Sequence, residues 1–157
     1  MRLSSMVAPV LLILAGAFIA AGPGMAHAAA LPKSALVIKT ADGKEQHFTV
    51  ELASTEDERS EGLMFRTSLA PDAGMLFDFK ESATVAMWMK NTYIPLDMLF
   101  IAGDGRIVRV AERTVPLSLT PISSGEPVLA VLELASGTAD RLHIKPGDRV
   151  IHPIFAR

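Results

Sequence analysis

The stretch LFIAGDGRIVRVA, Leu99 to Ala111, shows the pattern on which the fold of this chain depends. Two short apolar runs, 99–102 and 106–111, flank the sequence Gly103-Asp104-Gly105. Asp-Gly supplies the positive φ angles that tight turns between antiparallel strands require. The stretch therefore predicts a β-hairpin.

The same pattern recurs on both sides of this hairpin. Ala41-Asp42-Gly43 separates two further candidate strands, 35–40 and 46–53. Four more segments have strand length and apolar character, namely 75–79, 84–89, 128–134 and 149–155. So many short strands in one chain of this size indicate a mostly β domain, a small closed or strongly curled antiparallel barrel-like sheet.

Only two segments favour a helix, which makes the expected class α+β with one or two short helices. Thr55-Glu56-Asp57-Glu58 has the form of a capping box, and it predicts a helix from Glu56 to about Met64. A second helix is expected over 138–144, before Pro146-Gly147. The segment 115–127 contains three prolines and is typical of a long loop.

The first 28 residues have the order of a secretory signal peptide. Arg2 precedes an apolar run, 7–21, and Ala26-His27-Ala28 has the form of a cleavage site. The run is shorter than the roughly 20 residues that a membrane-spanning helix needs. We therefore expect cleavage after Ala28 and one periplasmic or secreted domain, 29–157, without stable membrane insertion. The alternative is an uncleaved N-terminal anchor.

Composition narrows the classes of partner. The chain has no cysteine, so it offers neither a disulfide nor a site for lipid attachment through a thiol. Without its first 28 residues it loses one basic residue, Arg2, and keeps 14 Lys and Arg against 17 Asp and Glu, a net charge of -3. A weakly acidic domain without a basic run argues against nucleic acid or an anionic membrane as partner.

Four phrases in the chain form a more specific pattern: EDERSEGLMFR at 56–66, GMLFDF at 74–79, MWMKNTYIPLDMLF at 87–100 and VLELASG at 131–137. In this order they resemble the bacterial and archaeal family of domain of unknown function 192, over about residues 50–157. The family usually has Phe where this chain has Met87, a change that keeps the side chain apolar. The resemblance implies a small, mostly β, often exported domain, and it implies no established activity.

Charged residues inside the apolar phrases are the candidate site. Burying a charge costs several kcal/mol unless the charge is paired, so such residues have a structural or a functional reason. They could point to solvent, or form an internal ion-pair network that fixes the corner at KNTYIP. In the functional interpretation these charged residues and the neutral Asn91 converge at one end of the barrel and line a ligand cleft. The candidates are Arg59, Arg66, Lys90, Asn91, Asp97 and Glu133. Since guanidinium groups bind carboxylates and phosphates well, a small polar or anionic ligand is expected, with a partner protein of the cell envelope as the other possibility.

Catalytic motifs are missing from the sequence. It has no G-x-S-x-G, no H-E-x-x-H, no phosphate loop and no thiol, so we predict a binding or accessory module rather than an enzyme, without a cofactor. One alternative is a hydrolase that uses Asp97 and Glu133 as acid and base, which requires both carboxyls in one cleft. Another is a periplasmic Cu(I) or Ag(I) protein that uses the thioethers of Met87 and Met89, although methionine is more often a core residue.

Overall fold

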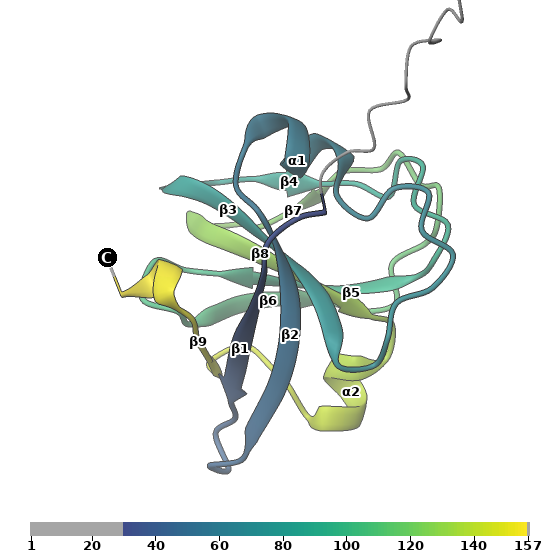
Figure 1. Cartoon of the computed structure of the whole chain (residues 1–157). Coiled ribbons are helices and arrows are strands. Elements are labelled where there is room, and N and C mark those ends of the chain that lie inside the picture. Colours follow the sequence, from purple (N-terminus) through teal and green to yellow (C-terminus); the bar gives the residue numbers. More distant parts are fainter. Residues whose placement is uncertain (1–29, 157) are drawn as a thin grey trace, which may run out of the picture.

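The computed structural model describes residues 30–156, so the predicted signal peptide lies outside the described residues. Seven strands form one sheet in the order β6-β5-β8-β3-β2-β1-β9, and β4 and β7 form a separate pair (Figure 1). The strands are β1 Lys33–Lys39, β2 Glu45–Ala53, β3 Ala73–Ala83, β4 Ala86–Met87, β5 Leu96–Ile101, β6 Ile107–Ala111, β7 Ile122–Ser123, β8 Val128–Ala135 and β9 Arg149–Ile151. The helical segments are α1 Glu56–Glu61, α2 Thr138–Leu142 and the 3-10 turn η1 Pro153–Phe155.

The large sheet is strongly curled, as the strand pattern predicted. Backbone bonds join its two edges at one end, because the N–H of Ile107 donates to the Asp148 carbonyl at 2.9 Å and the N–H of Val150 donates to the Gly105 carbonyl at 2.8 Å. A Cβ on Gly105 would lie 2.5 Å from the Val150 carbonyl oxygen, and its φ is +84°. The Asp-Gly turn that predicts the hairpin is therefore also where the sheet edges meet.

One strand pair departs from the expected antiparallel sheet. Strands β2 and β3 run parallel, with Thr49 opposite Ala73 and Ala53 opposite Phe77. The chain leaves the sheet after Ala53, crosses through α1 and re-enters in the same direction, and such a crossover makes neighbouring strands parallel. All other strand pairs among the described residues are antiparallel.

The capping box predicted at Thr55 is confirmed. The Thr55 hydroxyl accepts from the Glu58 N–H at 3.2 Å, and the Glu58 carboxylate accepts from the Thr55 N–H at 2.8 Å. The helix ends at Glu61 rather than near Met64, because Gly62 follows with a φ of +51°. The second predicted helix is also present as α2, and it stops at Leu142, before His143 at a φ of +56°.

Other boundaries moved by a few residues. The strand expected over 84–89 is reduced to β4, and the loop expected over 115–127 includes its partner β7. The strand expected over 149–155 stops at Ile151, because Pro153 begins the 3-10 turn η1. Among residues 30–156, no helix has the length and apolar character needed to cross a membrane.

The sheet has an apolar core on each face. Leu76, Leu99, Leu132 and Leu134 belong to the core inside the curl, which also includes residues of β1, β2, β6, β9 and α2. Alternate residues of β3, β5 and β8 face the other way and form a second core with side chains from outside the sheet. The members of this second core are Ala53, Leu63, Met75, Phe77, Met89, Leu96, Met98, Phe100, Val128 and Val131. Glu133 lies two residues after Val131 on β8, so both side chains point to the side of the second core.

Candidate functional site

Glu133 is a buried carboxylic acid in the middle of the sheet. It lies on β8 between Met75 of β3 and Met98 of β5, and both neighbours are fully buried. Glu133 is 4% exposed, and no described residue forms a hydrogen bond or ion pair with its carboxyl group. Among the described residues no fully buried side-chain oxygen or nitrogen lacks a partner, so the carboxyl oxygens keep contact with the space above them. Burial raises the pKa of Glu133 from 4.5 to about 8, so the carboxyl is mostly neutral at pH 7.

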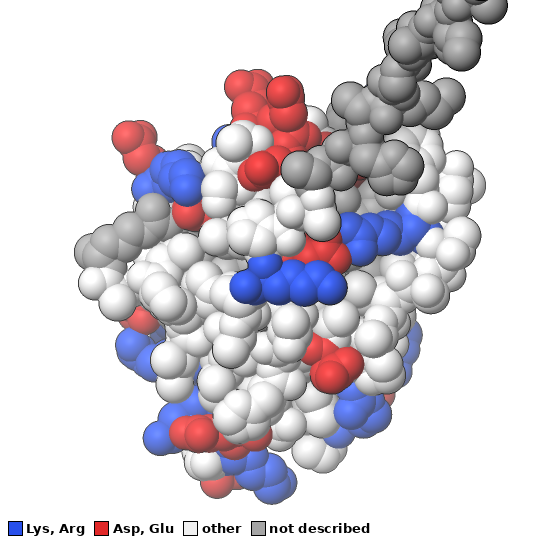
Figure 2. Space-filling model, in the orientation of Figure 1, with Lys and Arg blue, Asp and Glu red and all other residues white. Residues whose placement is uncertain are grey.

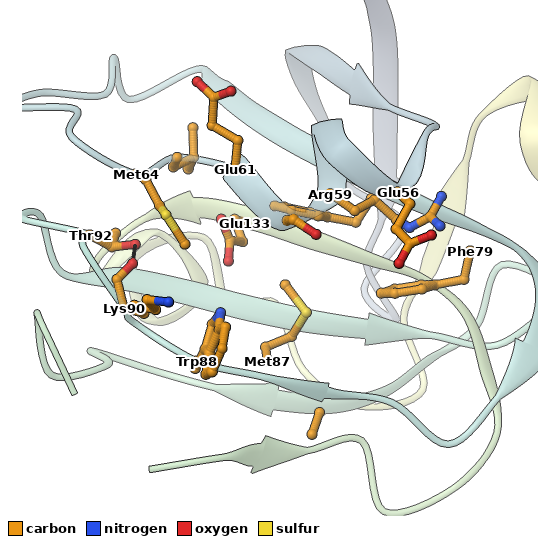
Figure 3. Close-up of a pocket in the computed structure, with 15 residues that line it drawn as sticks. Glu56, Arg59, Glu61, Met64, Phe79, Met87, Trp88, Lys90, Thr92 and Glu133 are labelled. Atoms are coloured by element: carbon orange, nitrogen blue, oxygen red, sulfur yellow. Dashed lines mark hydrogen bonds between the residues drawn. The ribbon is translucent and has the colours of Figure 1, made fainter. Parts of the chain in front are cut away.

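A pocket of about 260 Å³ opens over Glu133. Its walls come from α1 and the segment that follows it, from β3, and from β4 with the start of the KNTYIP loop (Figure 3). Met64 and Met87 point into the pocket from opposite sides, and Glu133 lies between these two walls (Figure 3). The lining residues are Glu56, Arg59, Ser60, Glu61, Gly62, Leu63, Met64, Phe77, Phe79, Ala86, Met87, Trp88, Lys90, Thr92 and Glu133.

Lys90 and Arg59 line this pocket without reaching Glu133. The Lys90 ammonium lies 5.2 Å from the centre of the Trp88 ring, and no described carboxylate forms an ion pair with it. The Arg59 guanidinium donates to the carbonyls of Ser54 at 2.8 Å and Asp78 at 2.9 Å, and it lies 5.5 Å from the Phe79 ring centre. Both cations are therefore held at the walls by aromatic rings or backbone carbonyls. The structure brings together Arg59, Lys90 and Glu133 of the six predicted cleft residues.

Arg66 lies in a different place. Its guanidinium donates two bonds to the Glu51 carboxylate, at 2.8 and 2.6 Å, and this pairing lowers the pKa of Glu51. The pair lines a second cavity of about 610 Å³. That cavity is larger, but Arg66 and Glu51 satisfy each other, and Glu58 is used in the capping box. The buried Glu133 has no such partner among the described residues, so its pocket is the stronger candidate site.

Asn91 supports the pocket from outside. Its φ of +54° places it in the left-handed region, as expected for a corner residue. Its carbonyl accepts from the Phe65 N–H at 2.8 Å, and its amide nitrogen lies 3.7 Å from the Met64 sulfur. Asn91 therefore joins the KNTYIP corner to the chain segment that carries Met64.

Asp97 has a structural role. It is fully buried, and its carboxylate accepts from the Arg113 N–H and from the Ala139 N–H, each at 2.9 Å. These bonds attach β5 to the loop after β6 and to the first turn of α2. Its partners are backbone groups, so Asp97 does not belong to the internal ion-pair network that was one of the alternatives from the sequence.

The hydrolase alternative is also wrong in its pairing of acids. Asp97 shares its face of β5 with Leu99 and Ile101, which belong to the core inside the curl. Glu133 shares its face of β8 with Val131, which belongs to the second core. The two carboxyls therefore lie on opposite faces of the sheet and cannot act on one substrate. Asp97 lies opposite Leu134, the residue after Glu133. Successive residues of a strand face opposite sides of the sheet, so this closeness does not bring the two carboxyls together.

The burial of Met89 argues against the copper alternative. Met87 lines the pocket, but Met89 is fully buried and its sulfur lies 3.1 Å from the Thr114 hydroxyl. The two thioethers therefore do not form an open pair for Cu(I). Within residues 30–156, no three His, Asp or Glu side chains gather as a metal site.

Several pocket residues were not predicted from the sequence. Glu56 shares one face of α1 with Arg59 and Ser60, because residues three and four apart are neighbours on a helix. Once Arg59 was a candidate, this spacing could have indicated Glu56. Phe77 and Phe79 are two apart on β3, but only the packing of α1 over that strand places them in the pocket.

All residues that line the pocket except Ala86 come from the four sequence phrases, and the comparison with protein families agrees with that pattern. The profile of domain of unknown function 192, described as an uncharacterized ACR, matches residues 37–152. The chain belongs to this family. The match begins earlier in the chain than the resemblance over about 50–157 suggested, and it ends slightly earlier.

Solved structures related to this family member share the fold. A protein of Sinorhizobium meliloti 1021, described provisionally as a transcription regulator, has 51% identity and a TM-score of 0.78, over 80% of this chain and 97% of that chain. A protein of unknown function from Novosphingobium aromaticivorans DSM 12444 has 40% identity and a TM-score of 0.76, over 85% and 94%. A search of the curated proteins gives no significant match.

Proposed function

We propose that the protein is an exported binding module of the cell envelope, whose pocket over Glu133 holds a small polar or anionic organic ligand. The observation that carries the proposal is the Glu133 carboxyl, which is buried, faces the pocket and has no partner among the described residues. Buried polar groups in folded proteins are nearly always paired, since an unpaired one is costly. An acid in a cleft whose pKa is strongly shifted is accordingly a candidate binding residue.

The lining supports a ligand with polar ends and an apolar body. A neutral Glu133 can both donate and accept a hydrogen bond. The unpaired ammonium of Lys90 can bind a carboxylate or another oxyanion. The side chains of Phe77, Met64 and Met87 provide apolar walls between these groups.

A nucleic-acid partner is left out of the proposal. The transcription-regulator description applies to the S. meliloti protein, and this chain carries a net charge of -2. Figure 2 shows Lys and Arg interspersed with Asp and Glu on the face in view, rather than a continuous basic stripe. Proteins that bind DNA or RNA usually present such a stripe.

Ligand binding to the native state would test this function. The protein, purified after export from a bacterial host, would be screened by thermal shift against small organic acids, amines, amino acids and sugars. A true ligand raises the melting temperature by mass action, and calorimetry then gives its dissociation constant. We expect Glu133→Gln to weaken binding about tenfold or more.

The control for this experiment is Glu45→Gln, a matched substitution on the exposed side of β2. It should leave the affinity unchanged. Equal affinity of wild type and Glu133→Gln for every hit would rule out the pocket as the binding site.

A further inference from the structure

A carboxylic acid and two cations line the Glu133 pocket without contact between the acid and either cation. Lys90 and Arg59 lie at its walls, while the Glu133 carboxyl lies between them in the sheet (Figure 3). A cation that touches a buried carboxyl favours its ionised form, so such groups normally pair. Here they stay apart, and the space of about 260 Å³ between them is open.

We propose that this space accepts a small zwitterion of the α-amino-acid type, with its ammonium group on Glu133 and its carboxylate on Lys90. The inference rests on the proposed function and names the class of ligand for the same pocket. Such a molecule gives Glu133 a cationic partner and Lys90 an anionic partner.

The surroundings of Glu133 favour a cationic donor. Its cross-strand neighbours are Met75 and Met98, so no described side chain supplies a hydrogen bond to its carboxyl. Arg59, a cation that lines the pocket, is held by the carbonyls of Ser54 and Asp78. The donor that reaches Glu133 must therefore come with the ligand or be solvent.

The position of Lys90 favours an anionic group at the outer end. Lys90 is exposed, lies against the Trp88 ring and has no ion pair among the described residues. An α-carboxylate at this end would pair with its ammonium, and Met64 and Met87 would contact the ligand's side chain.

A truncated ligand would satisfy only one end of the pocket. A simple amine would leave Lys90 without an anionic partner, and a simple acid would leave Glu133 without a cationic donor. A zwitterion supplies both groups.

Binding should release a proton. When the ligand's ammonium reaches the neutral Glu133 carboxyl, the O–H bond of the acid breaks, the proton passes to solvent, and a carboxylate–ammonium pair remains. Because the pKa of Glu133 is raised to about 8 in the unliganded pocket, the affinity should rise about tenfold for each unit by which the pH increases toward that value, and it should level off above it. Glu133→Gln should abolish this pH dependence.

The test uses the common amino acids, each compared with its decarboxylated amine and its deaminated acid; for leucine these are 3-methylbutan-1-amine and 4-methylpentanoate. We expect the best amino acid to bind at least about tenfold more tightly than either truncated compound. Glu133→Gln should weaken the amino acid but not the deaminated acid. Lys90→Met should weaken the amino acid but not the amine, and Lys39→Met, at an exposed site on β1, should weaken neither.

The outcomes separate this inference from the proposed function. If no amino acid binds, or a truncated compound binds as tightly as its parent, the zwitterion is wrong. A different ligand whose affinity depends on Glu133 would still support a binding protein. If every ligand found is insensitive to Glu133→Gln, both proposals fail.

Discussion

At the scale of single residues, the chain contains two acids in strands that look alike in sequence and differ in environment. Asp97 and Glu133 both stand between apolar neighbours, and both are buried. Two backbone N–H groups bind Asp97, whereas Glu133 faces a pocket and has no described partner. The first acid stabilises the fold, and the second is the group that we propose binds a ligand.

Glu133 should make the protein less stable as the pH rises. In the folded state its pKa is about 8, compared with 4.5 for the ordinary group, so the folded protein keeps a proton that the unfolded chain releases. The contribution of Glu133 to the free energy of unfolding is therefore fully present below pH 4.5. It is lost as the pH rises from there to about 8, by about 1.4 kcal/mol per pH unit. Urea denaturation of wild type and Glu133→Gln at about pH 5 and about pH 8 measures this.

Glu133→Gln should be more stable than wild type at about pH 8, because the glutamine side chain stays neutral there. Exposed Glu45→Gln should show the wild-type slope. Identical pH dependence in wild type and Glu133→Gln would contradict the buried, unpaired state of this acid.

Asp97→Asn should destabilise the protein. Asparagine offers one oxygen where the carboxylate accepts two N–H groups, so its amide would face either the Arg113 or the Ala139 N–H. A cost of about 1–3 kcal/mol is expected for this buried mismatch. Chemical denaturation at neutral pH checks it, with Asp72→Asn in an exposed loop as the control that should change stability by less than about 0.5 kcal/mol. A change for Asp97→Asn as small as the control's would remove its structural role.

At the scale of elements, the pocket depends on how α1 and β3 are held. Helix α1 has six residues and none of them is buried, so its own core contacts contribute little. The capping box and the bonds from Arg59 to Ser54 and Asp78 fix it beside β3 instead. Strand β3 in turn lies very close to β8 at Glu133, because Gly74 stands at the contact.

Gly74→Ala should therefore disturb the strand pairing beneath the pocket. A Cβ at this position would lie 2.6 Å from the Glu133 carbonyl oxygen and 2.8 Å from a Leu134 methyl group. Backbone atoms cannot move away without separating β3 from β8, so we expect a loss of about 1–3 kcal/mol in denaturation experiments.

Gly103→Ala is the matched control for Gly74→Ala. Its added Cβ comes no closer than 3.4 Å to any described atom outside its own neighbours, the nearest being the Ser82 hydroxyl oxygen. It should cost clearly less. Equal losses for the two glycines would show that close strand approach is not the reason for Gly74.

At the scale of the whole molecule, one curled sheet supports two separate cores. The core inside the curl uses residues of all seven strands, and the second core covers the other face of β3, β5 and β8. Such a double-sided central sheet explains how β8 can carry a largely buried acid, Glu133, whose carboxyl meets only the pocket. It also places the pocket on the side opposite Asp97.

Export is a testable property of the whole chain. We expect mass spectrometry of the protein secreted by a bacterial host to give a chain that begins at Ala29, because small residues occupy Ala26 and Ala28 of the cleavage site. Replacing Ala28 with a large charged residue, Ala28→Arg, should block processing and leave the longer chain. Recovery of the uncleaved wild type in the inner membrane would favour the anchor instead.

Local sequence was sufficient for many elements. The Asp-Gly turns, the capping box at Thr55 and the strand periodicity predicted a curled, mostly β domain, since each depends on residues close together in the chain. The parallel pairing of β2 with β3 was missed, because strands are brought together by a crossover whose path is set by packing rather than by either strand.

The sequence by itself determined the family, the class of fold and the presence of charged residues in the apolar phrases. Only the tertiary structure decided which acid is structural and which faces the pocket. An alternating pattern shows that a residue points away from its neighbours, but it does not show what covers that face. For Asp97 the cover is backbone N–H groups, and for Glu133 it is a pocket beneath α1, assembled from segments that are distant in the chain.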